Sequence, residues 1–414
     1  MKKALFITFD IVREDESEVS LAMASILTTL KNNKVVADTV LLDHITVNML
    51  PLGSNVTNAD FPTFIFGKKI YELDYVLISV SVWNEYFINE FIAFLKENGF
   101  SGKIVLGGHQ ITYNGREELL WKYKDANVFI IGYAEESLIE LFLNDSDVKF
   151  LNAPIDFNNL LSPFLENEVV INANTKMIRW ETKRGCPYKC SFCAHRDLTN
   201  KKVHYFGIEK ALREIEYFNN TNIKRINILD PVFNIGKEYL SVMEKIVQTN
   251  NSIQYTLQTR FESIKKEDGR KFLDLCSLGN FHLEFGVQTV NEEESKSIDR
   301  NNNYGIMYEM LEEIKVRDIS SEISLIYGLP GQTLDSFKMS IDELQKRGCN
   351  DIKAYPLMLL QGTKLYKSKS DWEMKEEVIG DYNIPVVTSS KTFTKKDWIA
   401  MEYLANQLQP SNRL

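Results

Sequence analysis

Short apolar runs alternate with amphipathic stretches along most of this 414-residue chain, and this alternation restricts the fold more than any other feature. Each apolar run is short enough for one strand, and stretches such as 19–32 and 84–98 are long enough for a helix that crosses back over a sheet. Strands joined by such crossovers run parallel. For residues 1–150 we therefore predict a doubly wound, Rossmann-like α/β domain, with strands at 4–9, 35–42, 75–82, 103–106 and 128–131.

The alternation stops at residues 151–175 and then resumes. This interval contains Pro154, Pro163 and several asparagines, which indicate an irregular linker. Six further strand-like runs alternate with helical stretches and predict a partial (β/α)6 TIM-like barrel over residues 176–367, with its site at the carboxyl-terminal mouth. Residues 368–414 are expected to form a small C-terminal helical region, with an amphipathic helix near 395–409. The barrel strands are expected at 177–181, 225–229, 255–258, 282–288, 322–327 and 351–357.

Charge and hydropathy narrow the classes of partner. The formal net charge of -9 is spread along the chain, and no block of lysine or arginine indicates a nucleic-acid partner. No stretch approaches the roughly 18 apolar residues that a membrane helix needs, and the apolar run at the start is too short for a secretion signal. We therefore expect a cytoplasmic protein that binds neither nucleic acid nor membrane.

The cysteines are distributed unevenly. Three of the five fall within eight positions, whereas Cys276 and Cys349 stand alone. An odd and clustered set favours a metal site in a reducing compartment over a disulfide framework. The two isolated cysteines are expected to be small buried side chains.

The clustered cysteines are Cys186, Cys190 and Cys193, in a loop directly after the strand expected at 177–181. Three thiolates leave one iron of a cubane cluster without a protein ligand, whereas an electron-transfer cluster normally uses four cysteines. The open iron can chelate the amino and carboxylate groups of a methionine moiety, and an electron from the cluster can then cleave a carbon–sulfur bond of the sulfonium. A structural zinc site with His195 or His204 as fourth ligand is an alternative, and a chance cluster of buried thiols is another.

The Cys-x-x-x-Cys-x-x-Cys spacing, with the aromatic Phe192 before the third cysteine, resembles the signature of radical S-adenosylmethionine (radical SAM) enzymes. The resemblance implies a [4Fe-4S] cluster on the three cysteines and S-adenosylmethionine (SAM) as cofactor, with Phe192 near the adenine. Gln288 and Arg300 resemble a pattern of the oxygen-independent coproporphyrinogen oxidases and their relatives, where the two residues contact the ribose and carboxylate of SAM. A guanidinium group can bind a carboxylate through two hydrogen bonds.

Four further residues at strand ends are implied as cofactor contacts by the same resemblance. In members of the family, an aspartate that binds the ribose hydroxyls often stands at the position of Ser324. At the position of Gln258, members often carry a glutamate. Arg260 is a second candidate anchor for the carboxylate. Asp230 closes the second barrel strand, where many members have a Gly-Gly-Glu-like turn that receives the methionine amino group. A structural role as a turn or cap is the alternative for each of them.

The order of the two domains resembles a radical SAM subgroup with an N-terminal cobalamin-binding domain, and residues 79–84 with Gly107-Gly108 are typical of that domain. The best-known cobalamin domains supply a histidine from an Asp-x-His-x-x-Gly loop after the first strand. Here the loop reads Asp10-Ile11-Val12-Arg13-Glu14, and the histidines of the domain are His44 and His109. Members of the subgroup are known to bind cobalamin without this histidine. The question of whether this chain binds cobalamin therefore stays open.

We therefore expect a radical SAM enzyme that reductively cleaves SAM to modify a small metabolite or peptide, with a flavodoxin- or ferredoxin-type electron donor. The reaction is either cobalamin-dependent methyl transfer in a natural-product or metabolite pathway, or a cobalamin-free dehydration, epimerisation or transfer of a SAM-derived fragment. A non-catalytic metal-binding protein is the remaining alternative. Conversion of SAM to 5′-deoxyadenosine or another cleavage product in the presence of a reductant separates the enzyme from the non-catalytic protein.

Overall fold

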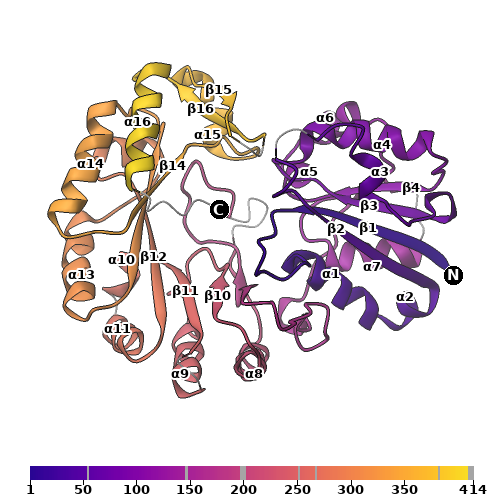
Figure 1. The fold of residues 1–414 in the computed structure, drawn as a ribbon, viewed down its shortest axis with the longest axis horizontal. Helices are drawn as coiled ribbons and strands as arrows, with labels where there is room; N and C mark the ends of the chain where they lie inside the picture. Colours follow the sequence, from indigo (N-terminus) through magenta and orange to yellow (C-terminus); the bar gives the residue numbers. More distant parts are fainter. Residues whose placement is uncertain are drawn as a thin grey trace. The chain divides into compact units, whose positions relative to one another are not determined.

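Two six-stranded parallel sheets organise the chain (Figure 1). The structure is a computed structural model that describes residues 1–53, 56–144, 148–195, 202–249, 252–265, 268–380 and 383–408. It divides into two units, the first formed by residues 1–175 with 379–384 and the second by residues 176–378 with 385–414. No helix within the described ranges combines the length and the apolar character that a membrane span requires.

The first unit has the strand order β2-β1-β3-β4-β5-β6, and every neighbouring pair is parallel. The order reverses between β1 and β3, and ligands of open α/β sheets bind beyond the carboxyl ends of the strands at such a point. This topology confirms the predicted doubly wound fold. Its strands are β1 (Lys2–Asp10), β2 (Val40–Asn48), β3 (Tyr75–Ser79), β4 (Lys103–Gly107), β5 (Val128–Ile130) and β6 (Phe150–Leu151).

Helices cover both faces of this first sheet. Alternate residues of β1 enter two different cores: Leu5, Ile7 and Phe9 pack in one, and Ala4 and Phe6 in the other. A parallel sheet that is buried on both faces leaves short apolar runs in the sequence, which is why its strands could be predicted. The helices are α1 (Leu21–Asn32), α2 (Lys34–Thr39), α3 (Phe61–Phe64), α4 (Ile88–Glu97), α5 (His109–Thr112), α6 (Arg116–Lys122) and α7 (Glu135–Asn144), with short η1 (Ile70–Glu72), η2 (Glu85–Phe87) and η3 (Phe157–Asn159).

The strand predicted at 35–42 is wrong over its first half. Residues Lys34–Thr39 form helix α2, and strand β2 begins only at Val40. The side chain of Asn33 accepts a hydrogen bond from the backbone N–H of Val36 at 3.2 Å and so caps the helix. This local hydrogen bond outweighs the strand preference of the β-branched residues that follow it.

The second unit has the order β14-β13-β12-β11-β10-β7, so each strand pairs with its neighbour in the sequence. All these pairs are parallel, and β7 and β14 are the two edges. Helices lie between successive strands, and Figure 1 shows α8, α9, α11, α13 and α14 along one side of the sheet. This open arrangement confirms the partial barrel. Its strands are β7 (Met177–Trp180), β10 (Arg225–Ile228), β11 (Gln254–Thr259), β12 (Phe281–Gln288), β13 (Ser321–Tyr327) and β14 (Ile352–Pro356).

The helices of this unit are α8 (Ile208–Asn219), α9 (Tyr239–Thr249), α10 (Phe261–Ile264), α11 (Gly269–Leu278), α12 (Glu292–Ser297), α13 (Tyr304–Val316) and α14 (Leu334–Lys346). Strand β12 shows how the barrel wall is divided between two environments. Phe281, Leu283, Phe285 and Val287 are buried, whereas the alternating residues, from His282 to Gln288, are half-buried. Because successive side chains of a strand point to opposite faces, the polar residues of β12 share one face.

The C-terminal region adds a short hairpin and the amphipathic helix that was expected. Helix α16 (Lys395–Leu408) buries Trp398, whose ring centroid lies 5.7 Å from that of Tyr327 on β13. The hairpin was not predicted from the sequence. The remaining elements are α15 (Lys364–Lys367), η4 (Lys369–Trp372), β15 (Lys375–Val378) and β16 (Pro385–Ser389), together with the small antiparallel pair β8 (Lys183–Arg184) and β9 (His204–Tyr205).

Candidate cluster-binding site

The cysteine loop begins directly after β8 with a glycine that the backbone requires. Gly185 has a φ of +88°, and a Cβ at this position would overlap the carbonyl oxygen of Lys202. Only glycine adopts this conformation readily and leaves the space that Lys202 needs. The glycine thus lets the chain turn sharply into Cys186.

Ser191, in the middle of the cysteine motif, is held through its backbone from two sides. Its N–H donates to the carbonyl oxygen of Ile298 at 2.8 Å, and its own carbonyl oxygen accepts from the N–H of Leu365 at 2.8 Å. Within the motif, the N–H of Cys193 donates to the carbonyl oxygen of Cys190 at 3.2 Å. The loop is therefore fixed by segments that lie far from it in the sequence.

The three thiols influence one another. Burial raises the pKa of Cys186, and the neighbouring Cys190 adds to this increase. Burial raises the pKa of Cys193 to about 11, with further contributions from Cys190 and Cys186, although the backbone N–H of His195 opposes the change. A bound metal would supply the positive charge that three neighbouring thiolates need.

The three sulfur atoms do not converge as the ligands of a single metal ion would. In the described part of the chain, His282, Glu322 and Asp351 place their possible ligand atoms within 4.8 Å of one another. The three cysteines do not form such a group. Tetrahedral zinc with its short Zn–S bonds would hold sulfur atoms about 3.8 Å apart. A cubane binds three thiolates through three separate irons, so its ligands do not have to converge on one ion.

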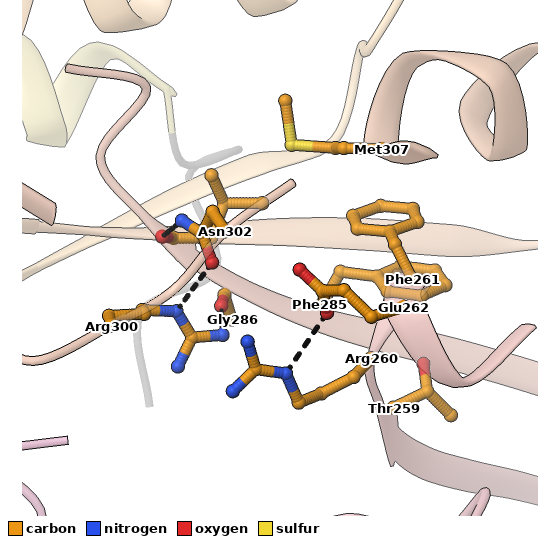
Figure 2. Close-up of a pocket in the computed structure, with 10 residues that line it drawn as sticks. Thr259, Arg260, Phe261, Glu262, Phe285, Gly286, Arg300, Asn302 and Met307 are labelled. Carbon is orange, nitrogen blue, oxygen red and sulfur yellow. Dashed lines mark hydrogen bonds and ion pairs between the residues drawn. The ribbon is translucent and has the colours of Figure 1, made fainter. Parts of the chain in front are cut away.

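Two arginines flank the cysteine loop. Nη1 of Arg300 lies 3.6 Å from Sγ of Cys190, and the guanidinium group of Arg260 lies 3.9 Å above the ring of Tyr188, inside the loop. The positive charges of both arginines act to lower the pKa of Cys186 and partly offset its burial. Figure 2 shows the two guanidinium groups near a small pocket of about 10 Å³, which has room for about one water molecule.

Each arginine is anchored by other protein groups. Nε of Arg300 donates to Asn302 Oδ1 at 3.1 Å, and its Nη2 donates to the carbonyl oxygen of Gly286. Nε of Arg260 donates to Glu262 Oε2 at 3.1 Å (Figure 2). Neither side chain is therefore free to turn away from the cysteine loop without losing hydrogen bonds.

The end of β12 carries a bulge that gathers further predicted residues. Gln288 has a φ of +71°, and the pairing between β12 and β13 shifts between Gly286 and Gln288. A Cβ on Gly286 would lie only 2.6 Å from Nε2 of Gln288, so the glutamine side chain lies over this glycine. Ser324 is the strand partner of Gly286 on β13. The structure thus brings Gln288, Arg300 and Ser324 together around Gly286.

The other sequence-predicted residues lie in different surroundings. Gln258 is half-buried on β11 beside Glu284 of β12, and Phe192 is half-buried between the second and third cysteines. Asp230 has no exposed surface. Its carboxylate accepts hydrogen bonds from the backbone N–H of Thr182 at 2.8 Å and from the Thr182 hydroxyl at 2.5 Å. The structure therefore places Asp230 in a buried contact with Thr182 and Lys183, just before the cysteine loop, where its carboxylate is already hydrogen-bonded.

Comparison with known proteins identifies the domain that contains the cysteine loop. Residues 180–344, which include the cysteine loop and both arginines, match the family model of the Radical SAM superfamily. This part of the chain is therefore a radical SAM domain. The assignment confirms the recognition made from the cysteine spacing, and the matched region ends within helix α14.

Relatives of known function resemble the radical SAM region of this chain. The cobalamin-dependent radical SAM methyltransferase TokK of Streptomyces tokunonensis is 29% identical over 192 residues, which are 45% of this chain and 28% of TokK. This chain thus matches little more than a quarter of that relative's length.

Solved radical SAM structures resemble the whole chain. The radical SAM methyltransferase TsrM of Kitasatospora setae is 12% identical with a TM-score of 0.72, over 99% of this chain and 90% of TsrM. The cobalamin-dependent radical SAM enzyme OxsB is 13% identical with a TM-score of 0.70, over 97% of this chain and 66% of OxsB. These likenesses show that the fold of both units is shared.

Several residues of the radical SAM domain were not singled out from the sequence. Asn234 is buried, and its side chain accepts from the N–H of Arg260 at 3.2 Å and donates to the carbonyl oxygen of Arg260 at 3.1 Å. Asn302 and Tyr188 contact the two arginines, as described above. Asn234 lies only four positions after Asp230, at the same strand end, so its location was a usable signal.

Proposed function

We propose that this protein is a cobalamin-dependent radical SAM methyltransferase that acts on a small molecule. The observation that carries the proposal is the loop of three cysteines, flanked by Arg260 and Arg300, within a chain whose two units together share the fold of TsrM and OxsB. The name of TokK and the structures of TsrM and OxsB with cobalamin bound support the choice of methyl transfer over the cobalamin-free reactions.

Cys186, Cys190 and Cys193 would hold three irons of a [4Fe-4S] cluster. When bound, this cluster supplies the electron that cleaves a carbon–sulfur bond of SAM. The chain's own contribution is to fix the loop through Ser191 and to place two positive charges beside the thiolates. Both effects favour a negatively charged cluster, because preorganised charges stabilise it without having to reorient.

The polar side chains at the mouth of the barrel are suited to holding SAM. Gln288 and Ser324 lie beside Gly286 at the end of β12. Gln258 is half-buried on the neighbouring strand β11. We propose that these amide and hydroxyl groups bind the polar groups of SAM, with Phe192 near its adenine.

The first unit supplies features that suit cobalamin. A cavity of about 530 Å³ opens beyond the ends of β1 and β2 and is lined by carboxylate and amide side chains, such as Glu14 and Asn174, which can hydrogen-bond to amide groups of cobalamin. At the end of β4, Gly108 has a φ of +102°, and a Cβ there would lie 2.6 Å from the carbonyl oxygen of Val80. These features support a large ligand at this edge of the sheet.

No histidine follows β1, so the cobalt would have no ligand from that loop. The histidines of the first unit lie elsewhere: His44 is in the middle of β2, and His109 begins α5, where its ring centroid is 4.7 Å from that of Tyr113. The electron that reduces the [4Fe-4S] cluster would come from a flavodoxin- or ferredoxin-type protein.

The experiment is an anaerobic turnover assay on the full chain reconstituted with iron and sulfide, incubated with SAM, cobalamin and a one-electron reductant. We expect bound cobalamin and conversion of SAM to 5′-deoxyadenosine or S-adenosylhomocysteine. The variant Cys193→Ala should lose conversion, whereas Cys276→Ala, a matched control at a buried cysteine outside the loop, should keep it. Conversion without cobalamin binding would replace methyl transfer by a cobalamin-free reaction, and no conversion would contradict the proposal.

A further inference from the structure

The backbone ladder between β12 and β13 ends at Gln288, one of the proposed contacts of SAM. The pairing shifts between Gly286 and Gln288, and the last pair is Gln288 with Leu325. The φ of Gln288, +71°, lies in the left-handed region, which residues with a side chain rarely adopt. Such a backbone persists only where its surroundings hold it in place. The residues after Gln288 must therefore supply interactions that the ladder no longer provides.

Thr289, the residue directly after Gln288, has no exposed surface and is held through both its hydroxyl and its carbonyl group. The hydroxyl donates to Oε2 of Glu294 at 2.6 Å and accepts from the backbone N–H of Asn291 at 3.0 Å. The carbonyl oxygen accepts from the hydroxyl of Tyr304 at 3.3 Å. These bonds fix Thr289 against helices α12 and α13, and they fix the backbone of Gln288 with it.

The carboxylate of Glu294 also reaches the turn that follows β13. Its Oε2 accepts a second hydrogen bond, from Nε2 of Gln332 at 3.3 Å. Oε1 of Gln332 accepts from the backbone N–H groups of Gly328 at 2.7 Å and Leu329 at 3.2 Å, directly after the end of β13. Glu294 and Gln332 are 2% and 0% exposed. The two side chains therefore connect the ends of β12 and β13 beyond the point where the backbone ladder stops.

The buried carboxylate of Glu294 is an unfavourable choice for stability alone. Its two donors are a hydroxyl and an amide, neither of which carries a charge, and its Oε1 is buried without a partner among the described residues. Burial of a charge with so few partners costs free energy. A hydrogen bond to a carboxylate is, however, stronger than one between neutral groups. The carboxylate thus favours firm positioning of Thr289 over overall stability.

We propose that Glu294 is a positioning residue for SAM: it holds Thr289, and through Thr289 it keeps Gln288 in the conformation that binds the cofactor. Through Gln332 it also fixes the end of β12 relative to β13, the strand that carries Ser324. The inference rests on the proposed function, because it requires Gln288 to contact SAM. Without this bridge the end of β12 would also populate conformations that do not bind SAM. The apparent dissociation constant of SAM rises as the population of the binding conformation falls.

The test is a titration of SAM against the anaerobically reconstituted full chain, with the cluster content of each variant matched by iron and sulfide analysis. Thr289→Val removes the hydroxyl and should raise the dissociation constant of SAM about tenfold. Thr289→Ser keeps the hydroxyl and should bind SAM within about twofold of the unaltered protein. Thr388→Val is a matched control, because the buried Thr388 hydroxyl also donates to a glutamate, at 2.8 Å to Oε1 of Glu377 in the C-terminal hairpin. It should leave the dissociation constant unchanged.

A purely structural role of Glu294 predicts a different result. Thr289→Val would then lower the melting temperature as Thr388→Val does, with SAM binding unchanged, and this outcome would overturn the inference. If Thr289→Val assembles no cluster, Glu294→Gln decides: it keeps the shape of the side chain but loses the charge, and the dissociation constant should rise about threefold. An unchanged constant in that variant would also overturn the inference. Failure of the unaltered protein to bind SAM would instead overturn the proposed function.

Discussion

Nζ of Lys183 lies 3.6 Å from Oδ2 of Asp230, and the two side chains are 3% and 0% exposed. The pair lies at the foot of the cysteine loop, since Lys183 is three positions before Cys186. Lys183 also donates to the carbonyl oxygens of Phe233 at 2.6 Å and Ile235 at 3.2 Å. The pair therefore joins the loop that follows β10 to the strand that leads into the metal motif.

Removal of Asp230 should destabilise the barrel without acting on SAM directly. Asp230→Ala leaves the buried ammonium group of Lys183 without its carboxylate partner, which costs about 3–5 kcal/mol of unfolding free energy. Denaturant unfolding of the full chain measures this loss. The double variant Lys183→Met/Asp230→Ala should recover part of it, because no buried charge remains. A single variant with unchanged stability but weaker SAM binding would show that Asp230 is a cofactor contact after all.

Substitution of Gly185 should impair assembly of the cluster. Gly185→Ala forces a side chain into the left-handed region at φ +88° and against the Lys202 carbonyl oxygen, so the turn into Cys186 has to move. Gly331→Ala is a matched control, because Gly331 has a φ of +79° but nothing within 4 Å of its Cβ position. Both variants should lose about 1–2 kcal/mol from the backbone alone. Only Gly185→Ala should also lose iron content, and equal iron retention in the two variants would contradict this account of the loop.

His44 should make the stability of the first unit depend on pH. Burial lowers the pKa of His44 below its usual 6.5, with Lys31 adding to the decrease and Asp43 and Glu168 opposing it. The unfolded chain therefore binds the proton at a pH where the folded chain has released it. Stability should rise with pH up to about 6.5 and no longer depend on this group above that value.

Thermal unfolding at a series of pH values checks the effect of His44. The melting temperature should fall as the pH is lowered through 6.5, and His44→Asn should reduce this fall. The same pH dependence in both proteins would show that His44 has no part in it.

Most strands of both sheets could be predicted because buried parallel strands leave short apolar runs in the sequence. Helix α2 could not, since its start depends on one hydrogen bond from Asn33 to the N–H of Val36 rather than on the hydrophobic pattern. The hairpin of β15 and β16 was missed for a related reason. Its first strand, Lys375–Val378, contains mostly charged and exposed residues and has no apolar alternation.

The cysteine loop could be predicted from spacing alone, but the environment of its neighbours could not. The sequence resemblance predicts that Arg300 lies near the cofactor. The groups that accept hydrogen bonds from its side chain depend on the bulge at Gly286 and on the orientation of Asn302. Likewise, Asp230 and Asn234 are both polar residues that follow β10. Only the folded chain shows that Asp230 contacts Thr182, 48 positions earlier, whereas Asn234 holds the backbone of Arg260.

The most direct measurement of the central claim is metal analysis combined with Mössbauer spectroscopy of the anaerobically reconstituted full chain. We predict iron and sulfide in the ratio of a [4Fe-4S] cluster, with the signal of one iron site changed by SAM. Replacement of Cys186, Cys190 or Cys193 by alanine should abolish the cluster, and replacement of Cys276 or Cys349 should not. Zinc on the three cysteines, or a cubane in which SAM perturbs no iron, would contradict the account.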